Sequence, residues 1–302
     1  AYEIMPSLVG SEMCIRDRSI LTVHAHPDDE SSKGPGTISL YSSQGVRTTL
    51  VCCTGGEVGD ILNPAMDRVE VQKDLASVRR AELDSAAAII GYDEVVMLGY
   101  RDSGMPDSDH NKHPEAFANA TLDAAAGRLV EIIRRVRPQV VVTYPEVQNR
   151  YPHPDHLQVT AISLSAFERA GDSHWYPEAG APYEPIKLYA PVWSKQRLLL
   201  VHQAFLDRGL KSPYDKKWLS GKDRDDRITA VIPVDNAVRR KALLAHATQV
   251  DPQSPFWFGL PDDVQDAIHP YEEYMLLRSR IPTDEVEDDL FAGVRHLADR
   301  TD

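Results

Sequence analysis

The sequence predicts an α/β fold with a Rossmann-like architecture, in which a mostly parallel sheet carries helices on both faces. Short apolar segments alternate with longer segments of helical period, and this alternation is typical of parallel sheets. Residues 139–144 (QVVVTY) are almost continuously apolar, as in a strand covered on both faces. The two most unusual polar clusters directly follow predicted strands, at the edge where such sheets bind ligands.

Residues 19–171 are expected to form the core of this fold. Apolar runs predict strands at residues 20–24, 47–53, 95–98 and 139–144. Apolar residues at helical spacing predict helices at residues 35–44, 69–90, 116–136 and 156–170, with Gly91 and Pro138 as stop signals.

The chain after Gly171 is predicted to be a C-terminal α/β extension, residues 172–302, that caps the same sheet. A loop rich in Pro and Gly (172–185) precedes strands at 186–193 and 228–235 and helices at 195–209 and 236–247. Residues 1–18 have neither a structural period nor the features of a secretion signal. They resemble a translated sequencing adapter, so we expect a non-native or disordered segment there.

The charge balance of the chain indicates which kinds of partner the protein can bind. The chain has 33 Lys and Arg against 46 Asp and Glu, a formal net charge of −13. This acidity argues against a nucleic-acid binder, which needs positive charge to displace counterions, and against docking on an anionic membrane. No apolar stretch approaches the ~20 residues of a membrane span. We therefore expect a small-molecule substrate and a monomer or small homo-oligomer.

The cysteines Cys14, Cys52 and Cys53 form no disulfide framework, because their number is odd and two are adjacent. Adjacent side chains in a strand point to opposite faces, so Cys52 and Cys53 are expected on opposite sides of the sheet. This cysteine usage fits a reducing cytoplasm, where we expect the protein to act.

The first polar cluster, residues 24–30 (HAHPDDE), follows the first predicted strand. Ionisable groups beside a buried strand end are costly to desolvate unless a partner compensates them, and a divalent cation would do so. His26 and Asp29 are three residues apart and can converge on one ion. Imidazole and carboxylate are ligands that suit zinc, which keeps an open position in catalytic sites. His24 is expected to point away from His26 and to be structural.

The second polar cluster, residues 151–156 (YPHPDH), follows the fourth predicted strand and opens a helix. His153 and His156 flank a carboxylate, so one histidine can complete the metal site while the other groups act beside it. Because both clusters end parallel strands, they are expected at one edge of the sheet.

Together, the AHPDDE and HPDH segments resemble the LmbE-like, PIG-L-type zinc deacetylases. Further segments are similar to the branch of that family that acts on S-conjugates of mycothiol: ESSKG, CTGGE, NPAMDR, RRAEL, DSGMP, YPHPDH and AHATQVDP. The resemblance implies a zinc-dependent amidase that releases glucosaminyl-inositol and a mercapturate. The alternative is a deacetylase of N-acetylglucosaminyl-inositol or another N-acetyl-sugar.

The resemblance also implies roles for individual residues. The metal ligands would be His26, Asp29 and His156, holding zinc, although iron(II) accepts the same set. The catalytic residues would be Asp28 as general base, His153 as oxyanion stabiliser, Asp155 as the group that orients His153, and Tyr151 as a mobile residue near the carbonyl.

Two residues are expected at the sugar or inositol hydroxyls. Arg80 matches such a position in the family, although the residue alone would suggest a surface ion pair with Glu82 or Asp84. Asp102 follows the third predicted strand, where a turn-forming role is about as plausible as sugar binding.

Three further residues are assigned to the substrate. Lys33 would touch it in the amidase branch, and Glu57 would line the site or brace its own loop. His246 would contact the substrate even while capping a helix. The pocket mouth is expected to carry Glu146 and Arg150, where the sequence departs from the Gly-rich pattern of related amidases.

The aromatic residues of the C-terminal part are expected mostly in the core or cap, although some of them could wall a pocket for an apolar conjugate: Tyr183, Trp193, Phe256, Trp257 and Phe258. The sequence also bears on two other classes of protein. A binding protein without catalysis would need neither Asp28 nor His153. A nucleotide-dependent Rossmann enzyme would need a G-x-G-x-x-G motif after the first strand, which is missing there.

Overall fold

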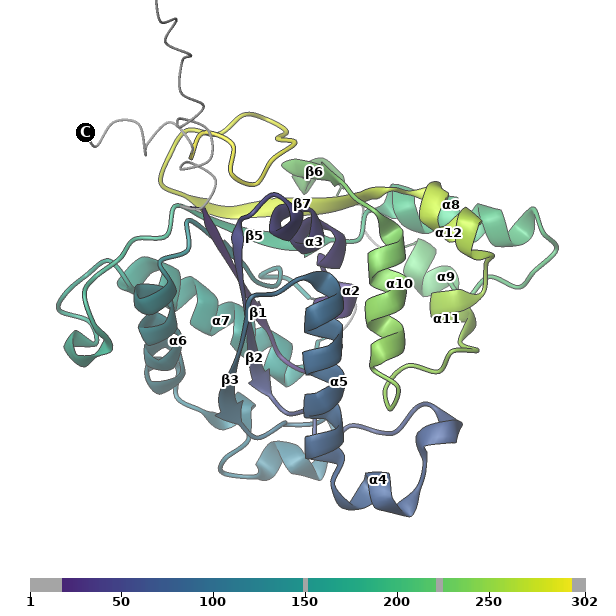
Figure 1. Ribbon diagram of the computed structural model, residues 1–302, viewed down its shortest axis with the longest axis horizontal. Helices are drawn as coiled ribbons and strands as arrows, with labels where there is room; N and C mark the ends of the chain where they lie inside the picture. The colour runs from purple at the N-terminus through teal and green to yellow at the C-terminus, as the bar shows by residue number, and fades with distance from the viewer. Residues whose placement is uncertain (1–17, 149–151, 221–224, 295–302) are drawn as a thin grey trace, which may run out of the picture.

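A single seven-stranded sheet runs through the computed structural model, which describes residues 18–148, 152–220 and 225–294 (Figure 1). The strand order is β3-β2-β1-β4-β5-β7-β6. Strands β1 to β5 pair in parallel, whereas β7 is antiparallel to both β5 and β6. The strands are β1 (Ser19–His24), β2 (Arg47–Thr54), β3 (Glu94–Tyr100), β4 (Val140–Val142), β5 (Lys187–Val192), β6 (Ala230–Pro233) and β7 (Tyr271–Ser279).

Helices cover both faces of the sheet (Figure 1). One face packs against α6 (Leu122–Val136) and α7 (Pro154–Arg169). The other packs against α3 (Pro35–Ser43), α5 (Leu75–Ile90) and α10 (Asn236–Ala245). The remaining helices are α2 (Asp29–Ser32), α4 (Val69–Lys73), α8 (Lys195–Leu206), α9 (Lys216–Leu219), α11 (Pro255–Phe258) and α12 (Asp262–Ile268), with 3-10 turns at Pro64–Met66, Asp109–Lys112, Phe117–Asn119, Pro177–Ala179 and Asp225–Arg227.

Alternation along the strands divides their side chains between the two cores. Cys53 packs in the core beneath α6 and α7, and Cys52 packs with Leu83 of α5 on the opposite face. The prediction that the two cysteines face opposite sides of the sheet is therefore confirmed. The predicted fold class is confirmed as well, because the sheet is mostly parallel and is covered on both faces.

The strand order reverses direction at β1. The chain passes from β1 to β2 and β3 on one side, and β4 then pairs with the free edge of β1 on the other. In open parallel sheets, ligands bind beyond the carboxyl ends of the strands at such a switch point. The loop after β1 and the loop after β4 carry the two polar clusters, so the topology brings both to this position.

Several predicted elements differ from the structure at their ends. The predicted helix at 69–90 is divided into α4 and α5, because Asp74 adopts non-helical angles (φ −141°, ψ 51°). The predicted helix at 116–136 begins only at Leu122, since Thr121 caps it by accepting a hydrogen bond from the Ala124 N–H. The helix predicted at 156–170 begins earlier, at Pro154, with His153 as its N-cap.

The antiparallel strand β7 has no counterpart among the predicted elements. Its sequence, YEEYMLLRS, mixes charged and apolar residues because it lies between two other strands and also carries the ion pairs of Glu272 and Glu273. The prediction for residues 1–18 falls outside the described residues, apart from Arg18.

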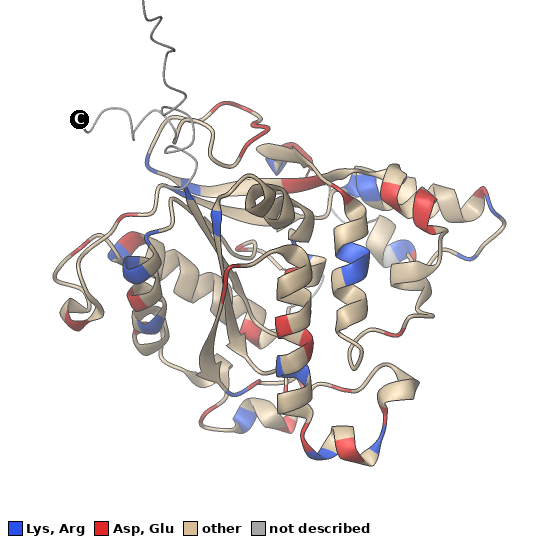
Figure 2. Ribbon diagram, in the orientation of Figure 1, with Lys and Arg blue, Asp and Glu red and all other residues tan. Residues whose placement is uncertain are grey.

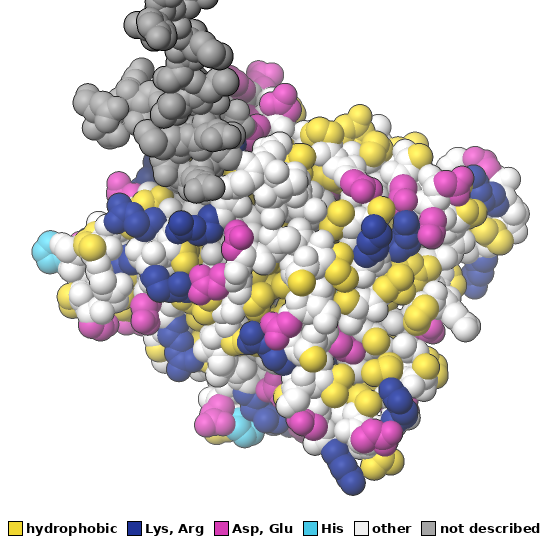
Figure 3. Space-filling model, viewed as in Figure 1, with side chains coloured by type: hydrophobic (Ala, Val, Ile, Leu, Met, Phe, Trp, Pro, Cys, Tyr) yellow, Lys and Arg dark blue, Asp and Glu magenta, His cyan; other side chains and the backbone are white. Residues whose placement is uncertain are grey.

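Charged side chains are distributed over many elements, and acidic and basic groups are interspersed on the face shown (Figures 2 and 3). Within the described residues, none of the helices is both long enough and apolar enough to cross a membrane.

Candidate active site

The loop between β1 and α2 holds Asp28 in an unusual backbone conformation. Its φ is 108°, in the left-handed region that non-glycine residues rarely adopt. The Asp28 N–H donates to Glu30 Oε2 at 2.9 Å, and the His26 N–H donates to Asp29 Oδ2 at 3.0 Å. These bonds fold the loop tightly, so that His26, Asp28 and Asp29 all face one cavity. Strain of this kind concentrates at functional sites, where surrounding contacts maintain it.

The predicted metal ligands are brought together. Asp29 Oδ2 lies 3.5 Å from His26 Nδ1 and 3.3 Å from His156 Nε2. One donor atom from each of these three residues lies within 4.8 Å of the other two, a group that could hold a metal ion. His156 reaches the group from the first turn of α7, because that helix begins directly after β4 and its loop.

The other ring nitrogen of His26 is held by a buried carboxylate. His26 Nε2 lies 3.1 Å from Asp155 Oδ2, and Asp155 is fully buried. Ser103 fixes that carboxylate in turn, since its N–H donates to Asp155 Oδ2 at 3.0 Å and its hydroxyl donates to Oδ1. A carboxylate behind a ligating histidine sets the tautomer and orientation of the ring, and is typical of metal sites.

The structure gives Asp155 contacts that the sequence did not predict. Its carboxylate holds His26 and Ser103, and its N–H donates to His153 Nδ1 at 3.2 Å. That Asp155 orients His153, as the resemblance implies, stays a prediction.

The charges around His26 fit a divalent cation. Burial opposes protonation of His26, but hydrogen bonds to Asp102, Asp155 and Asp29 outweigh it and raise its pKa well above the usual range. Burial also opposes ionisation of Asp29, yet Lys33 and then His156 hold the pKa of its carboxyl well below the usual range. Positive charge is thus favoured at this point, and two imidazoles with one carboxylate form a donor set that suits zinc.

Asp28 lies on the cavity wall beside Asp29. Burial, followed by the negative charge of Asp29, raises the pKa of the Asp28 carboxyl to about 7. A carboxylate of this pKa can accept a proton near neutral pH, as a general base must.

His153 packs edge-on against the His26 ring, with 4.6 Å between ring centroids, and lines the same cavity. Burial, followed by the charges of His26 and His156, lowers the pKa of His153 to about 4. The ring is therefore neutral at neutral pH. It can donate a hydrogen bond through Nε2, since Nδ1 accepts from the Asp155 N–H.

The cavity has a volume of about 1050 Å³ and joins the metal-ligating group to a wide, partly apolar wall. Lys33 and Asp102, which are predicted to contact the substrate, both line this cavity. The Lys33 ammonium contacts Asp29 and lies 5.4 Å from the centre of the Tyr144 ring. Asp102 Oδ1 lies 3.5 Å from His26 Nε2 and also accepts from the Gly104 N–H at 2.8 Å.

The other residues predicted at the substrate or at the pocket mouth do not line this cavity where the structure describes them. The Glu57 carboxylate accepts from the Asp102 N–H at 2.9 Å and so braces the loop after β3. His246 is fully buried and bonds to Glu30. Glu146 pairs with Arg278 on the surface. Tyr151 and Arg150 lie outside the described residues.

The expectation for Arg80 is corrected by its neighbour. Arg80 lies on the exposed side of α5 and pairs with Asp84 at 3.0 Å, outside the cavity. Arg79 is buried and lines the cavity, where it donates to the backbone oxygens of Gly56, Gly59 and Asp60. The sequence contained the signal, because position 79 lies at helical spacing from Leu83, Ala86 and Ile90, in the middle of the buried stripe, whereas position 80 lies at its edge.

The aromatic residues fall in different places. Trp193, Trp218, Phe256 and Trp257 form a connected aromatic cluster on the cavity wall, with centroid separations from 4.7 to 6.4 Å. Tyr183 packs against the core beneath α6 and under Arg137, away from the cavity.

Comparison with known proteins shows the family of the chain. The chain matches the family described as GlcNAc-PI de-N-acetylase, PIG-L, over residues 21–167. It is 44% identical over 290 residues to the mycothiol S-conjugate amidase of Streptomyces coelicolor, an alignment that covers 92% of this chain and 98% of that protein. The chain belongs to the PIG-L family.

A second PIG-L relative has a different substrate in its name. The 1D-myo-inositol 2-acetamido-2-deoxy-alpha-D-glucopyranoside deacetylase of Streptomyces avermitilis is 36% identical over 293 residues, covering 92% of this chain and 98% of that protein. The family prediction, drawn from the AHPDDE and HPDH segments, is confirmed. So is the enzyme class, since a PIG-L protein with such relatives is a hydrolase of amide bonds.

Solved structures show the same fold at low sequence identity. The N,N'-diacetylchitobiose deacetylase of Pyrococcus horikoshii has a TM-score of 0.57 at 18% identity, covering 88% of this chain and 86% of that one. The 4-carboxy-2-hydroxymuconate hydratase GalB of Pseudomonas putida has a TM-score of 0.55 at 20% identity, covering 88% and 99%. One fold therefore serves different reactions, so the residues of the site, and not the fold, indicate the function.

Proposed function

We propose that this protein is a zinc-dependent amidase that hydrolyses the amide of mycothiol S-conjugates, giving glucosaminyl-inositol and a mercapturate. The observation that carries the proposal is the union, in one cavity, of the His26, Asp29 and His156 group with the aromatic wall around Trp193. An acetyl group needs little room, whereas an S-conjugate brings both a pseudodisaccharide and an apolar substituent. A cavity of about 1050 Å³ matches the larger substrate.

His26, Asp29 and His156 would hold the zinc ion. When bound there, zinc supplies polarisation of the amide carbonyl and acidification of water. Asp28, beside these ligands, takes the proton from the attacking water, because its pKa of about 7 places it close to neutral pH.

The other polar groups of the cavity position and stabilise the substrate. His153 donates a hydrogen bond to the developing oxyanion, which is worth most in a site that excludes water. Arg79 and Asp102 lie on the part of the wall nearest the loops after β2 and β3, where they can bind sugar or inositol hydroxyls. Lys33, which contacts Asp29 and lines the cavity, offers an ammonium to the acyl portion.

The deciding experiment compares substrates. We expect kcat/KM for a mycothiol conjugate with an aromatic S-substituent to exceed that for N-acetylglucosaminyl-inositol, measured on the same zinc-loaded preparation. The same residues could deacetylate the N-acetyl sugar, as in the 36% identical relative. Turnover of the acetyl substrate alone would therefore replace the amidase proposal with the deacetylase. Metal analysis of protein purified in the absence of oxygen shows whether zinc or iron(II) is bound.

A further inference from the structure

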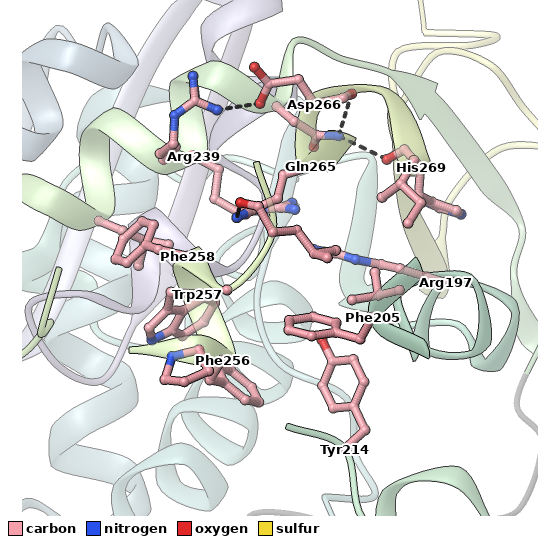
Figure 4. A pocket seen from close by; sticks show the side chains of 18 of the residues that line it. Arg197, Phe205, Tyr214, Arg239, Phe256, Trp257, Phe258, Gln265, Asp266 and His269 are labelled. Carbon is pink, nitrogen blue, oxygen red and sulfur yellow. Dashed lines mark hydrogen bonds and ion pairs between the residues drawn. The ribbon is translucent and has the colours of Figure 1, made fainter. Parts of the chain in front are cut away.

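A second, smaller cavity of about 80 Å³ lies behind the aromatic wall, enclosed by α8, α10, α11 and α12 (Figure 4). A single water needs about 10–15 Å³ of such space, so this cavity has room for a small molecule. Trp193, Leu243, Phe256 and Trp257 line both cavities. The small cavity is therefore separated from the reaction cavity by one layer of side chains.

Arg197 is one of the charged residues that line this space, together with Arg239, Arg240 and Asp266. It extends from the first turn of α8, and its guanidinium lies 4.8 Å from the centre of the Trp193 ring. Among the described residues, no oxygen accepts a hydrogen bond from this guanidinium and no carboxylate forms an ion pair with it. Burial, followed by the nearby Arg239 cation, lowers the pKa of Arg197 to about 9, so the side chain is still charged at neutral pH.

The carboxylates nearest to Arg197 are bound to other groups. Glu272 accepts from Arg239 Nη2 at 2.7 Å and from the N–H groups of Gly36 and Thr37 at 3.1 and 2.8 Å. Glu273 lies 3.3 Å from His269 Nε2.

Asp266, on the same cavity wall, pairs with Arg240. Arg197 is half-buried, and a cation that has lost part of its hydration without gaining a counter-ion is costly. The position therefore favours an anion that enters from solution.

Two further atoms of the cavity lining lack partners. Arg239 Nε is a buried donor, and Asn236 Oδ1 is a buried acceptor, and neither has a hydrogen-bond partner in the described part of the chain. The Asn236 amide nitrogen donates to the carbonyls of Asp266 and His269 at 3.2 and 3.0 Å, which fixes the direction of the amide oxygen. Both atoms are covered by their neighbours, so the Arg197 guanidinium is the group of this cavity that can reach an anion.

We propose that this cavity is a binding site for a small monocarboxylate, held by the Arg197 guanidinium and covered by the Phe205, Phe256 and Trp257 rings. The planar guanidinium matches the two oxygens of a carboxylate. The aromatic walls suit a short carbon chain behind it. Inorganic phosphate fits less well, because it carries more charge and needs more donors than one uncommitted guanidinium supplies.

Propionate is the probe. Zinc-loaded full-length protein is titrated with sodium propionate by calorimetry, with sodium chloride to hold ionic strength constant. The tryptophan fluorescence of the protein, to which Trp193 and Trp257 of the cavity wall contribute, is followed in parallel. Arg197→Met removes the charge but keeps a long side chain against Trp193. Arg208→Met is the matched control, since Arg208 is exposed, follows the same helix and lines neither cavity. Propionate bound at the zinc would be common to all three proteins and cancels in the comparison.

We expect Arg197→Met to bind propionate at this site about tenfold or more weakly than the wild type, and Arg208→Met to bind it like the wild type. Equal binding by Arg197→Met and Arg208→Met would overturn the proposal, and so would tighter binding of phosphate than of propionate. If Arg197→Met does not fold, a crystal of the wild type grown in propionate decides. Carboxylate density beside Arg197 supports the site, and water alone removes it.

Discussion

His246 Nε2 lies 2.6 Å from Glu30 Oε1, and both side chains are completely buried. Glu30 also accepts from the Asp28 N–H through Oε2, so the pair connects the C-terminal end of α10 to the loop that carries the catalytic carboxylates. His246 therefore acts on the site through Glu30, without reaching the cavity. The pair should also make stability depend on pH.

The dependence follows from the two pKa shifts. Burial opposes both charges, but each partner outweighs it, so the pKa of His246 is raised and that of Glu30 is lowered. The His246 contribution is present below its unfolded pKa of about 6.5 and is lost as the pH rises through the higher folded value. The Glu30 contribution is present above its unfolded pKa of about 4.3 and is lost as the pH falls through the lower folded value.

We therefore expect His246→Gln to destabilise the metal-free protein most near pH 5.5, by about 3–5 kcal/mol as for other broken buried pairs, and progressively less as the pH rises. Urea unfolding at several pH values measures this difference. Glu30→Gln in the same background controls for the pair, since the double variant should lose the pH dependence. A constant difference from pH 5.5 to 9 would show that the two charges do not interact.

Asp28→Asn should lower kcat by about 10²-fold or more while the protein keeps its metal. Asparagine tolerates the left-handed backbone at this position better than most residues, so the loop should persist. Turnover and metal content are measured on the same preparation. A variant that retains more than a tenth of wild-type kcat with full metal would remove Asp28 as the base.

The neighbouring arginines Arg79 and Arg80 provide a matched pair. Arg79→Met should lower the melting temperature and impair kcat/KM, because it leaves three backbone oxygens of the loop after β2 without their donor. Arg80→Met should change stability by less than about 1 kcal/mol, as expected for an exposed ion pair. Thermal unfolding and kinetics on both variants test the assignment, and equal effects would contradict it.

The same pair shows what sequence could and could not predict. The positions of the parallel strands follow from short apolar runs, and the candidate ligands follow from polar clusters at the ends of those runs. The side of a helix on which an arginine lies depends on one residue of register, so a motif match alone selected Arg80 in place of Arg79. The contacts of Asp155 with His26 and Ser103, and the pairing of β7 with β5 and β6, both depend on residues far away in the chain. Neither is encoded locally.

Asp155→Asn tests the support behind His26. The amide can keep one hydrogen bond but no longer stabilises the ring tautomer with a charge, so metal affinity should fall by about 10–100-fold with all three ligands intact. Competition with a chelating dye measures the affinity. Asp84→Asn, at an exposed position on α5, is the control. Unchanged affinity in Asp155→Asn would mean that Asp102 and Asp29 position His26 without it.

Trp218→Ala tests the aromatic wall separately from the chemistry. Trp218 lines the reaction cavity but not the smaller one, and its ring centroid lies 6.4 Å from that of Trp193 and 5.9 Å from that of Phe256. Losing it should lower kcat/KM for a conjugate with an aromatic S-substituent by about tenfold or more, a change typical of lost apolar contacts. Turnover of the N-acetyl sugar, which does not reach the wall, should be unaffected. Trp175→Ala, in a loop distant from both cavities, controls for the loss of an indole. An equal loss of kcat/KM on both substrates would mean that Trp218 supports folding and does not recognise the S-substituent.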